Sequence, residues 1–416
     1  MGDTISAAGG ALSTVAVPLL ALETLHAGGA AVGAVRAAQT LPFLLFAIPI
    51  GLLADRVSRR RLLLAADAVR FPLVGMIALL GAALTVNALI ALVFAVGVGT
   101  VAYEVAYLSV LPDLVDGPAE LPPANRAVET AHAGASLLGP AAGGVLIAAL
   151  SPAGVVACDA VSFAVGAILT AVNRWEHRPA NPALEPAPEP AREPPAVPAE
   201  GLVSADSAAG RPLARSALSA GWVWLWRDPV VRPMTLYLAA NNVAAQAFQT
   251  ALLLFVAHTL GLPATAVGFA IAAMGGGFLA GAALSPAAAR RAGTGRVIIA
   301  ASLVGALGIA TVAAAPPAAG FWPVLLGAAL AGAGPGMINL HSISVRQAIT
   351  PPTLLGRVNA VVKTISYGAT TVGALTGGVA ATAFGPRAVI AAAACASAAA
   401  TLFPALSAIR TLGTPR

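Results

Sequence analysis

One glutamate, Glu104, is placed where a carboxylate can do proton chemistry inside a membrane. It lies in an apolar run over 88–111, about eight residues from one end, between Tyr103 and Tyr107. A charge at mid-bilayer costs at least about 2.5 kcal/mol, so it normally faces a cavity or a partner. Such a carboxylate can tie the affinity for a bound molecule to its own protonation. We predict that Glu104, or alternatively Asp3 at the start of the first predicted helix, couples protons. A structural hydrogen bond from Glu104 to a neighbouring helix is the competing interpretation.

Polar side chains also gather in two other apolar runs, at 230–257 and 321–343. They are the amides Asn241, Asn242, Gln246, Gln249 and Asn339, together with His341. Amides facing lipid are costly, so these residues either line a cavity or join helices by hydrogen bonds. We predict a substrate cavity and keep the joining of helices as the alternative. Asp67 and Arg70 lie three residues apart on one helical face and are predicted to form a local ion pair.

Twelve apolar runs of helical length must position these residues. The 416-residue chain is 58% hydrophobic and 10% charged, whereas about a quarter of the residues in soluble domains are charged. Its mean hydropathy is +0.86. The runs lie at 5–25, 31–54, 62–84, 88–111, 125–149, 154–173, 230–257, 265–289, 297–315, 321–343, 357–383 and 387–409. A bilayer crossing takes about 20 apolar residues, so we predict an all-α membrane protein with twelve transmembrane helices in two six-helix bundles.

The basic residues set the predicted orientation. Lysine and arginine accumulate in short cytoplasmic loops, and the turn over 51–61 carries four arginines. With the amino terminus inside, only Arg36 and Arg387 of the 23 basic residues lie outside. We predict a multi-pass protein of the plasma (cytoplasmic) membrane with both termini cytoplasmic. The net charge of +6 does not indicate nucleic-acid binding, because the basic residues are dispersed in short loops.

A polar segment divides the chain into two halves. Residues 174–229 hold eight prolines between Pro179 and Pro198, a composition typical of a linker rather than a packed domain. Near its end, at 215–228, apolar residues recur at helical spacing and predict a short interfacial helix. The predicted domains are an amino-terminal bundle over 1–173, the cytoplasmic linker over 174–229, a carboxy-terminal bundle over 230–410 and a cytoplasmic tail over 411–416.

The two halves also repeat one pattern. Gly139, Gly143 and Gly144 recur as Gly373, Gly377 and Gly378, each 234 residues later. A six-helix repeat predicts two bundles related by a pseudo-two-fold axis, with a site between them.

The turn between the second and third apolar runs resembles a known family signature. Gly51-x-x-x-Asp55-Arg56-x-x-Arg59-Arg60 is similar to the loop 2–3 signature of the major facilitator superfamily. The stretches around Asn125, Asp159 and Arg346 resemble its enterobactin exporter-like and macrolide efflux-like branch. Charged hydrogen bonds from Asp55 can hold neighbouring helix ends and break when the bundles rock apart, which predicts gating. Alternatively, the arginines only enforce topology. Ser58 stands where the signature often has glycine, and the second half lacks the acid.

The segment Gly139-Pro140-Ala141-Ala142-Gly143-Gly144 forms a second motif. Gly139 and Gly143 lie one helical turn apart and permit close backbone approach, while Pro140 bends the helix. By resemblance this is an antiporter-type motif of the fifth helix. Ordinary packing of small residues explains the same pattern.

Together, the residues and the resemblance imply a secondary active transporter working by alternating access. We predict proton-coupled efflux of a small amphipathic compound, a drug or a siderophore-like metabolite, by a monomer whose partners are the substrate, protons and the lipid bilayer. Uptake of a nutrient by the same fold, or a membrane sensor or scaffold, are the alternatives. An enzyme is not expected, because HExxH, nucleophile-elbow and P-loop motifs are absent from the sequence. No cofactor or metal site is predicted, since Cys158 and Cys395 stand alone.

Overall fold

Long apolar helices make up the fold, and they follow the apolar runs of the sequence. The computed structural model describes residues 2–54, 57–110, 121–172, 213–316, 321–411 and 413. The helices of the first half are α1 (Gly2–Leu19), α2 (Gly29–Ala54), α3 (Arg59–Leu80), α4 (Val86–Val110) and α5 (Leu121–Val172). The π-helical turn Leu20–Thr24 extends α1, and the 3-10 turn Gly81–Ala83 follows α3.

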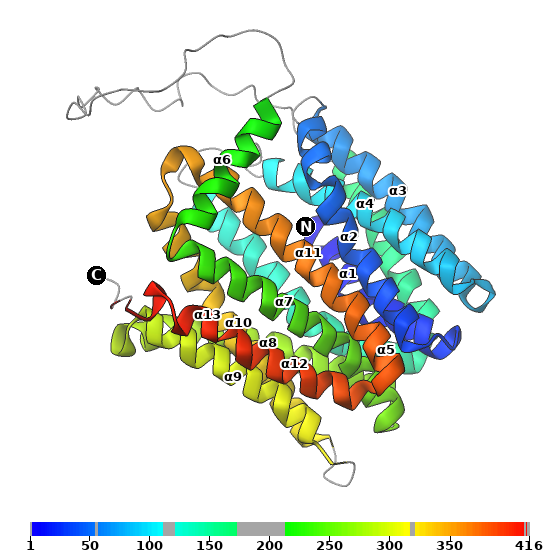
Figure 1. The fold of residues 1–416 in the computed structure, drawn as a ribbon. Coiled ribbons are helices and arrows are strands. Elements are labelled where there is room, and N and C mark those ends of the chain that lie inside the picture. Colours follow the sequence, from blue (N-terminus) through cyan, green and yellow to red (C-terminus); the bar gives the residue numbers. More distant parts are fainter. Residues whose placement is uncertain are drawn as a thin grey trace.

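The second half repeats this arrangement after a short connecting helix. That helix is α6 (Leu213–Arg227), and the following elements are α7 (Val231–Leu254), the π-turn Phe255–Thr259, α8 (Ala264–Ala292), α9 (Thr294–Ala314), α10 (Trp322–Ile349), α11 (Pro352–Phe384), α12 (Pro386–Ala400), α13 (Leu402–Ala405) and the 3-10 turn Ala408–Thr411. In Figure 1, α2, α3 and α4 lie on one side of the molecule, and α7, α9 and α12 lie on the other.

The predicted fifth and sixth spans form one element, α5, that bends at a single residue. Ser151 has φ 67° and ψ 164°, outside the helical region. The Ser151 hydroxyl accepts a hydrogen bond from the Gly154 amide, and Pro152 begins the second arm, as is usual at a helix amino terminus. The two spans predicted at 125–149 and 154–173 are therefore the two arms of α5.

The helices are compatible with twelve crossings. Nine of the helices that the structure describes are long and apolar enough to span a membrane, with the two arms of α5 counted as one. The more polar helices α7 and α11 occupy the spans predicted at 230–257 and 357–383. The predicted all-α membrane fold is thus confirmed.

Helix α6 packs on the second half. Its Leu225 is fully buried and clusters with Val358 and Val361 of α11. A Cβ at Gly221 would lie 2.9 Å from the Arg357 carbonyl carbon, so glycine is needed for this close approach. Trp222 on the same helix is exposed. Part of the apolar face of α6 therefore packs against α11, and part of it is exposed.

Candidate functional site

The two halves meet through two helix pairs, α2 with α11 and α5 with α8. A Cβ at Gly33 would lie 2.9 Å from the Gly378 Cα, and a Cβ at Gly268 would lie 2.4 Å from the Pro140 carbonyl oxygen. Backbones approach this closely only where side chains are absent. We call this region, where 29–33 meets 374–382 and 140–144 meets 264–268, the closed end.

Away from the closed end the helix pairs spread apart. A Cβ at Gly275 would be 3.2 Å from the Ser136 carbonyl oxygen, and one at Gly368 would be 3.8 Å from the Leu44 side chain. At Gly51 and Gly134, farther along the same helices, no described atom outside the helix's own backbone lies within 4 Å of the Cβ position. The spacing between the halves therefore increases from the closed end toward the opposite end.

Two cavities lie along this divergence, one in each half. The amino-terminal cavity has a volume of about 540 Å³ and is lined by α1, α2, α3, α4 and both arms of α5. The carboxy-terminal cavity has a volume of about 350 Å³ and is lined mainly by α7, α8, α9 and α10. Ser136 of α5 lines both cavities, so they adjoin between the halves.

The amino-terminal cavity contains Glu104, as a proton-coupling carboxylate requires. Glu104 is exposed on α4, and it lies within electrostatic range of Tyr367 on α11, in the other half. Tyr367 stacks on Phe43 of α2, with ring centroids 4.9 Å apart. The glutamate therefore lies in a cavity whose lining residue Phe43 contacts an aromatic ring of the other half.

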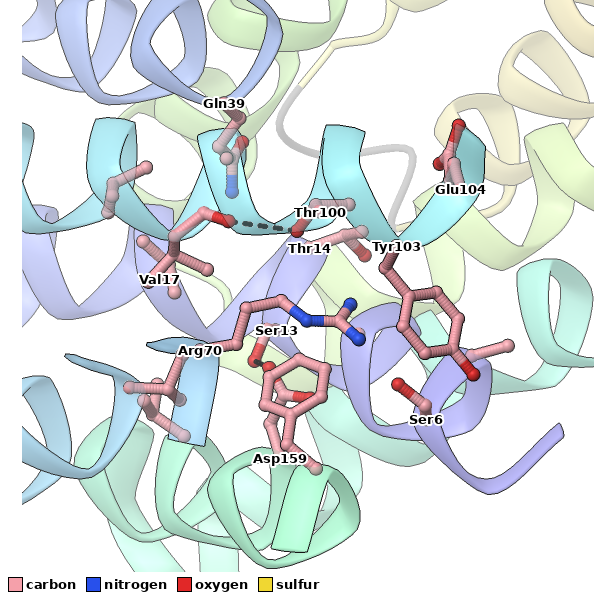
Figure 2. Close-up of a pocket in the computed structure, with 18 of the residues that line it drawn as sticks. Ser6, Ser13, Thr14, Val17, Gln39, Arg70, Thr100, Tyr103, Glu104 and Asp159 are labelled. Atoms are coloured by element: carbon pink, nitrogen blue, oxygen red, sulfur yellow. Dashed lines mark hydrogen bonds between the residues drawn. The ribbon is translucent and has the colours of Figure 1, made fainter. Parts of the chain in front are cut away.

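A second polar cluster lies on the wall of this cavity, and only two of its three charged residues were singled out from the sequence. The predicted ion pair between Asp67 and Arg70 is confirmed, and it is buried. Asp159, quoted above only for its resemblance, is also buried and accepts a hydrogen bond from Ser13 of α1. Figure 2 shows Arg70 directed toward Tyr103 and Asp159, while Glu104 points away from this group. An acid in the middle of an apolar run was the sequence signal for Asp159.

The predicted amides divide between the carboxy-terminal cavity and other positions. Asn241, Asn242 and Gln249 line this cavity. Asn241 also accepts a hydrogen bond from Ser397 of α12 at 2.9 Å, so cavity lining and the joining of helices coincide at this residue. Gln246 and Asn339 lie outside the residues that line the two cavities.

His341 joins two helices of the second half. It is buried, and its Nε2 lies 2.8 Å from the Ser285 hydroxyl, which donates to the Met337 carbonyl oxygen. It does not line either of the two cavities described. Asp3 lies in the first turn of α1, and its side chain is outside the described residues.

The glycine motif of α5 packs α5 against both halves. Cβ atoms at Gly139 and Gly143 would lie 2.3 Å from the Ala11 side chain and 3.1 Å from the Leu12 carbonyl oxygen of α1. Gly144 instead approaches α8, where a Cβ would lie 2.9 Å from the Ala264 carbonyl oxygen. The equivalent glycines of α11 do the same, because Gly373 and Gly377 approach α7 and Gly378 approaches α2. The sequence repeat is thus a repeat of helix contacts, and Pro140 supplies the carbonyl that meets Gly268.

The charged loop is described only in part. Asp55 and Arg56 lie outside the described residues. Arg60 of α3 donates to the carbonyl oxygens of Thr170 and Ala171 at the end of α5, where a cation stabilises the helix carboxy terminus. Arg59 begins α3, and Gly51 lies in the last turns of α2. Arg60 therefore joins helices within the first half.

Arg36, expected from the sequence at the outer side, is buried between the halves. Its Nη2 donates to the Gln249 Oε1 at 2.8 Å, from α2 to α7. Its Nε and Nη1 are buried without a hydrogen-bond partner in the described part of the chain. A buried polar group without a partner costs about 1–3 kcal/mol. The burial of Arg36 therefore destabilises the closed end.

We expect Arg36→Met to stabilise the closed end by about 1–3 kcal/mol, because it removes a poorly compensated buried charge. The measurement is the melting temperature in detergent, which should rise. Arg387→Met is the matched control, because Arg387 donates to the Ala315 carbonyl oxygen and stacks on Phe255 within one half. A lower melting temperature for Arg36→Met than for wild type would contradict this expectation.

A comparison with protein families assigns the chain to a family of membrane proteins. A family model described as transmembrane secretion effector matches residues 1–414. The chain belongs to this family. A search of curated proteins gave no match. The narrower likeness to the enterobactin exporter-like and macrolide efflux-like branch remains a resemblance.

Solved structures share the fold along almost the whole chain. The nucleoside transporter NupG aligns with TM-score 0.72 and 12% identity, covering 97% of this chain and 96% of that one. A bacterial homolog of the human lysosomal transporter Spinster, inward-facing and occupied, gives 0.70 and 15%, covering 97% and 95%. A bacterial homologue of the iron transporter ferroportin, inward-facing, gives 0.64 and 16%, covering 96% of each. The protein is therefore a multi-pass membrane protein of the transmembrane secretion effector family with the fold of these transporters.

Proposed function

We propose that this transporter exports a small amphipathic compound, a drug or siderophore-like metabolite, in exchange for protons. The observation that carries the proposal is Glu104, a carboxylate exposed in a cavity of about 540 Å³ within the membrane-spanning bundle. A carboxylate there can bind a proton and tie the affinity for substrate to its own protonation. The apolar and aromatic lining around it, including Phe43, Val93 and Tyr103, suits an amphipathic molecule.

Alternating access follows from the way the halves meet. The glycine contacts at the closed end and the wider spacing beyond them are what two rocking bundles require. With the predicted orientation, the closed end is extracellular and the cavities open toward the cytoplasm. In this state the transporter binds its substrate from the cytoplasm. It acts as a monomer in the plasma membrane, with both termini cytoplasmic.

Two further groups of predicted residues are assigned roles in this cycle. Asn241, Asn242 and Gln249 are proposed to bind polar groups of the substrate, since they line the second cavity. The loop of Asp55 and Arg56 is proposed to gate the cytoplasmic end by charged hydrogen bonds that break as the bundles rock.

Substrate-dependent proton movement in proteoliposomes tests this proposal. Purified full-length protein is reconstituted, and drugs, siderophores and sugars are added in turn while the internal pH is followed. Exchange predicts that an exported compound and protons move in opposite directions. Proton movement in the same direction as a sugar or other nutrient would favour uptake, and the absence of any substrate-dependent flux across all classes would contradict transport coupled to protons.

A further inference from the structure

Two buried carboxylates share one arginine on the wall of the amino-terminal cavity. Asp67 and Arg70 of α3 and Asp159 of α5 have exposed fractions of 0%, 3% and 3%. At a rise of 1.5 Å per residue, Asp159 lies about 12 Å along the helix from the kink at Ser151, which places it deep in the bundle. Arg70 and Asp159 both line the cavity.

The arginine is held in place between these acids. It pairs with Asp67, and its guanidinium lies 4.2 Å from the Tyr103 ring centroid and 4.3 Å from that of Phe163. Its Nε is buried and has no hydrogen-bond partner among the residues that the structure describes. Asp159, one helical turn before Phe163, is within electrostatic range of the guanidinium. Arg70 is thus bonded to one carboxylate and lies close to the other.

Asp159 is surrounded by hydroxyl groups. The Ser13 hydroxyl donates to the Asp159 Oδ2, and the Ser162 hydroxyl lies 3.4 Å from its Oδ1. Glycines permit this packing, because a Cβ at Gly9 would lie 2.6 Å from the Asp159 Oδ1. A Cβ at Gly99 would lie 2.8 Å from the Arg70 Cγ. Helices α1, α3, α4 and α5 therefore converge on one polar cluster.

Within the described part of the chain, the charges of this cluster do not balance when both acids are ionised. The described cluster then sets the carboxylates of Asp67 and Asp159 against the guanidinium of Arg70. The other described titratable groups that line the cavity are Tyr103, Glu104 and His132. An uncompensated buried charge is costly, and a buried acid avoids that cost by taking up a proton.

We propose that the Asp67–Arg70–Asp159 cluster is a proton-binding site, in which Arg70 neutralises Asp67 and Asp159 holds the proton beside the Ser13 hydroxyl. The proton leaves when Arg70 moves toward Asp159 and neutralises that carboxylate instead. The role of this cluster in transport rests on the proposed proton coupling. Asp159 is then a second proton-carrying carboxylate, besides Glu104.

Infrared spectroscopy of the full-length protein in lipid nanodiscs tests the site without any substrate. At neutral pH the wild type should show the carbonyl stretch of a buried protonated carboxylic acid, and Asp159→Asn should remove it. Glu104→Gln, which changes the other cavity acid, should leave this band in place. Ser13→Ala keeps the acid but removes its hydrogen-bond donor, so the band should shift in frequency.

Several outcomes would overturn the assignment. They are the absence of a protonated carboxylic acid band in wild type at neutral pH, its persistence in Asp159→Asn, or its loss in Glu104→Gln alone. If Asp159→Asn does not fold, as judged by its melting curve, the Ser13→Ala spectrum decides, and an unshifted band contradicts the proposal. A failed transport assay beside an intact band would refute the proposed function and leave this site standing.

Discussion

Glutamine in place of Glu104 is expected to abolish proton-driven accumulation of substrate while substrate counterflow continues. The amide resembles the protonated acid in shape but cannot release a proton, so the cavity still binds substrate without exchanging it for a proton. For one proton exchanged per substrate, a pH gradient of about one unit supports an accumulation ratio of about ten. The variant should give a ratio of about one, measured with labelled substrate in proteoliposomes.

Glu23→Gln is the matched control for this experiment. Glu23 is exposed in the turn after α1 and does not line either of the two cavities described, so its neutralisation should leave accumulation unchanged. Full proton-driven accumulation by Glu104→Gln, at the same protein level as wild type, would exclude Glu104 as the coupling residue. Asp159 or Asp3 would then carry that role.

Valine at Gly144 is expected to hold the closed end apart. The added Cβ would lie 2.9 Å from the Ala264 carbonyl oxygen and 3.0 Å from the Gly268 Cα. Overpacking of this kind costs about 1–3 kcal/mol. Here it destabilises the closed state, in which α5 contacts α8. The equilibrium between the states should therefore shift by about 5- to 150-fold away from closure.

Disulfide cross-linking across the closed end measures this shift. The Ala30 amide donates to the Thr382 hydroxyl at 2.8 Å, from α2 to α11, so cysteines at these two positions report closure. The exposed Cys158 and Cys395 are first replaced by serine. Gly144→Val should lower the cross-linking yield, whereas Gly75→Val should not, because no described atom outside the helix's own backbone lies within 4 Å of a Cβ at Gly75. An unchanged yield in Gly144→Val would show that this glycine contact does not limit closure.

Features that depend on neighbouring residues in the chain were predictable from the sequence. Apolar runs long enough to cross a bilayer predicted the helices, because lipid requires every backbone group to be bonded within its own segment. The ion pair of Asp67 and Arg70 followed from their spacing on one helical face. The repeated glycines predicted equivalent packing in the two halves, and the contacts of Gly144 with α8 and Gly378 with α2 have this symmetry.

Contacts between distant helices were not predictable in this way. Ser13 and Asp159 are 146 residues apart, and Arg36 and Gln249 are 213 apart. Periodicity within one helix shows which face is polar, but it does not show which helix that face meets. Arg36 lies near the start of a predicted span and therefore resembled a loop residue, although tertiary packing buries it. Asp159 lacked a charged neighbour at helical spacing, so its relation to Arg70 emerged only in three dimensions.

The direction of proton-driven transport tests the central claim most directly. Membrane vesicles turned inside out, which expose the cytoplasmic face, are loaded with an acidic interior and given the labelled compound that moved protons in proteoliposomes. Export in exchange for protons predicts accumulation inside these vesicles that collapses when a protonophore removes the pH gradient. Accumulation that occurs instead only in right-side-out vesicles under an inward proton gradient would contradict the account and identify an uptake system.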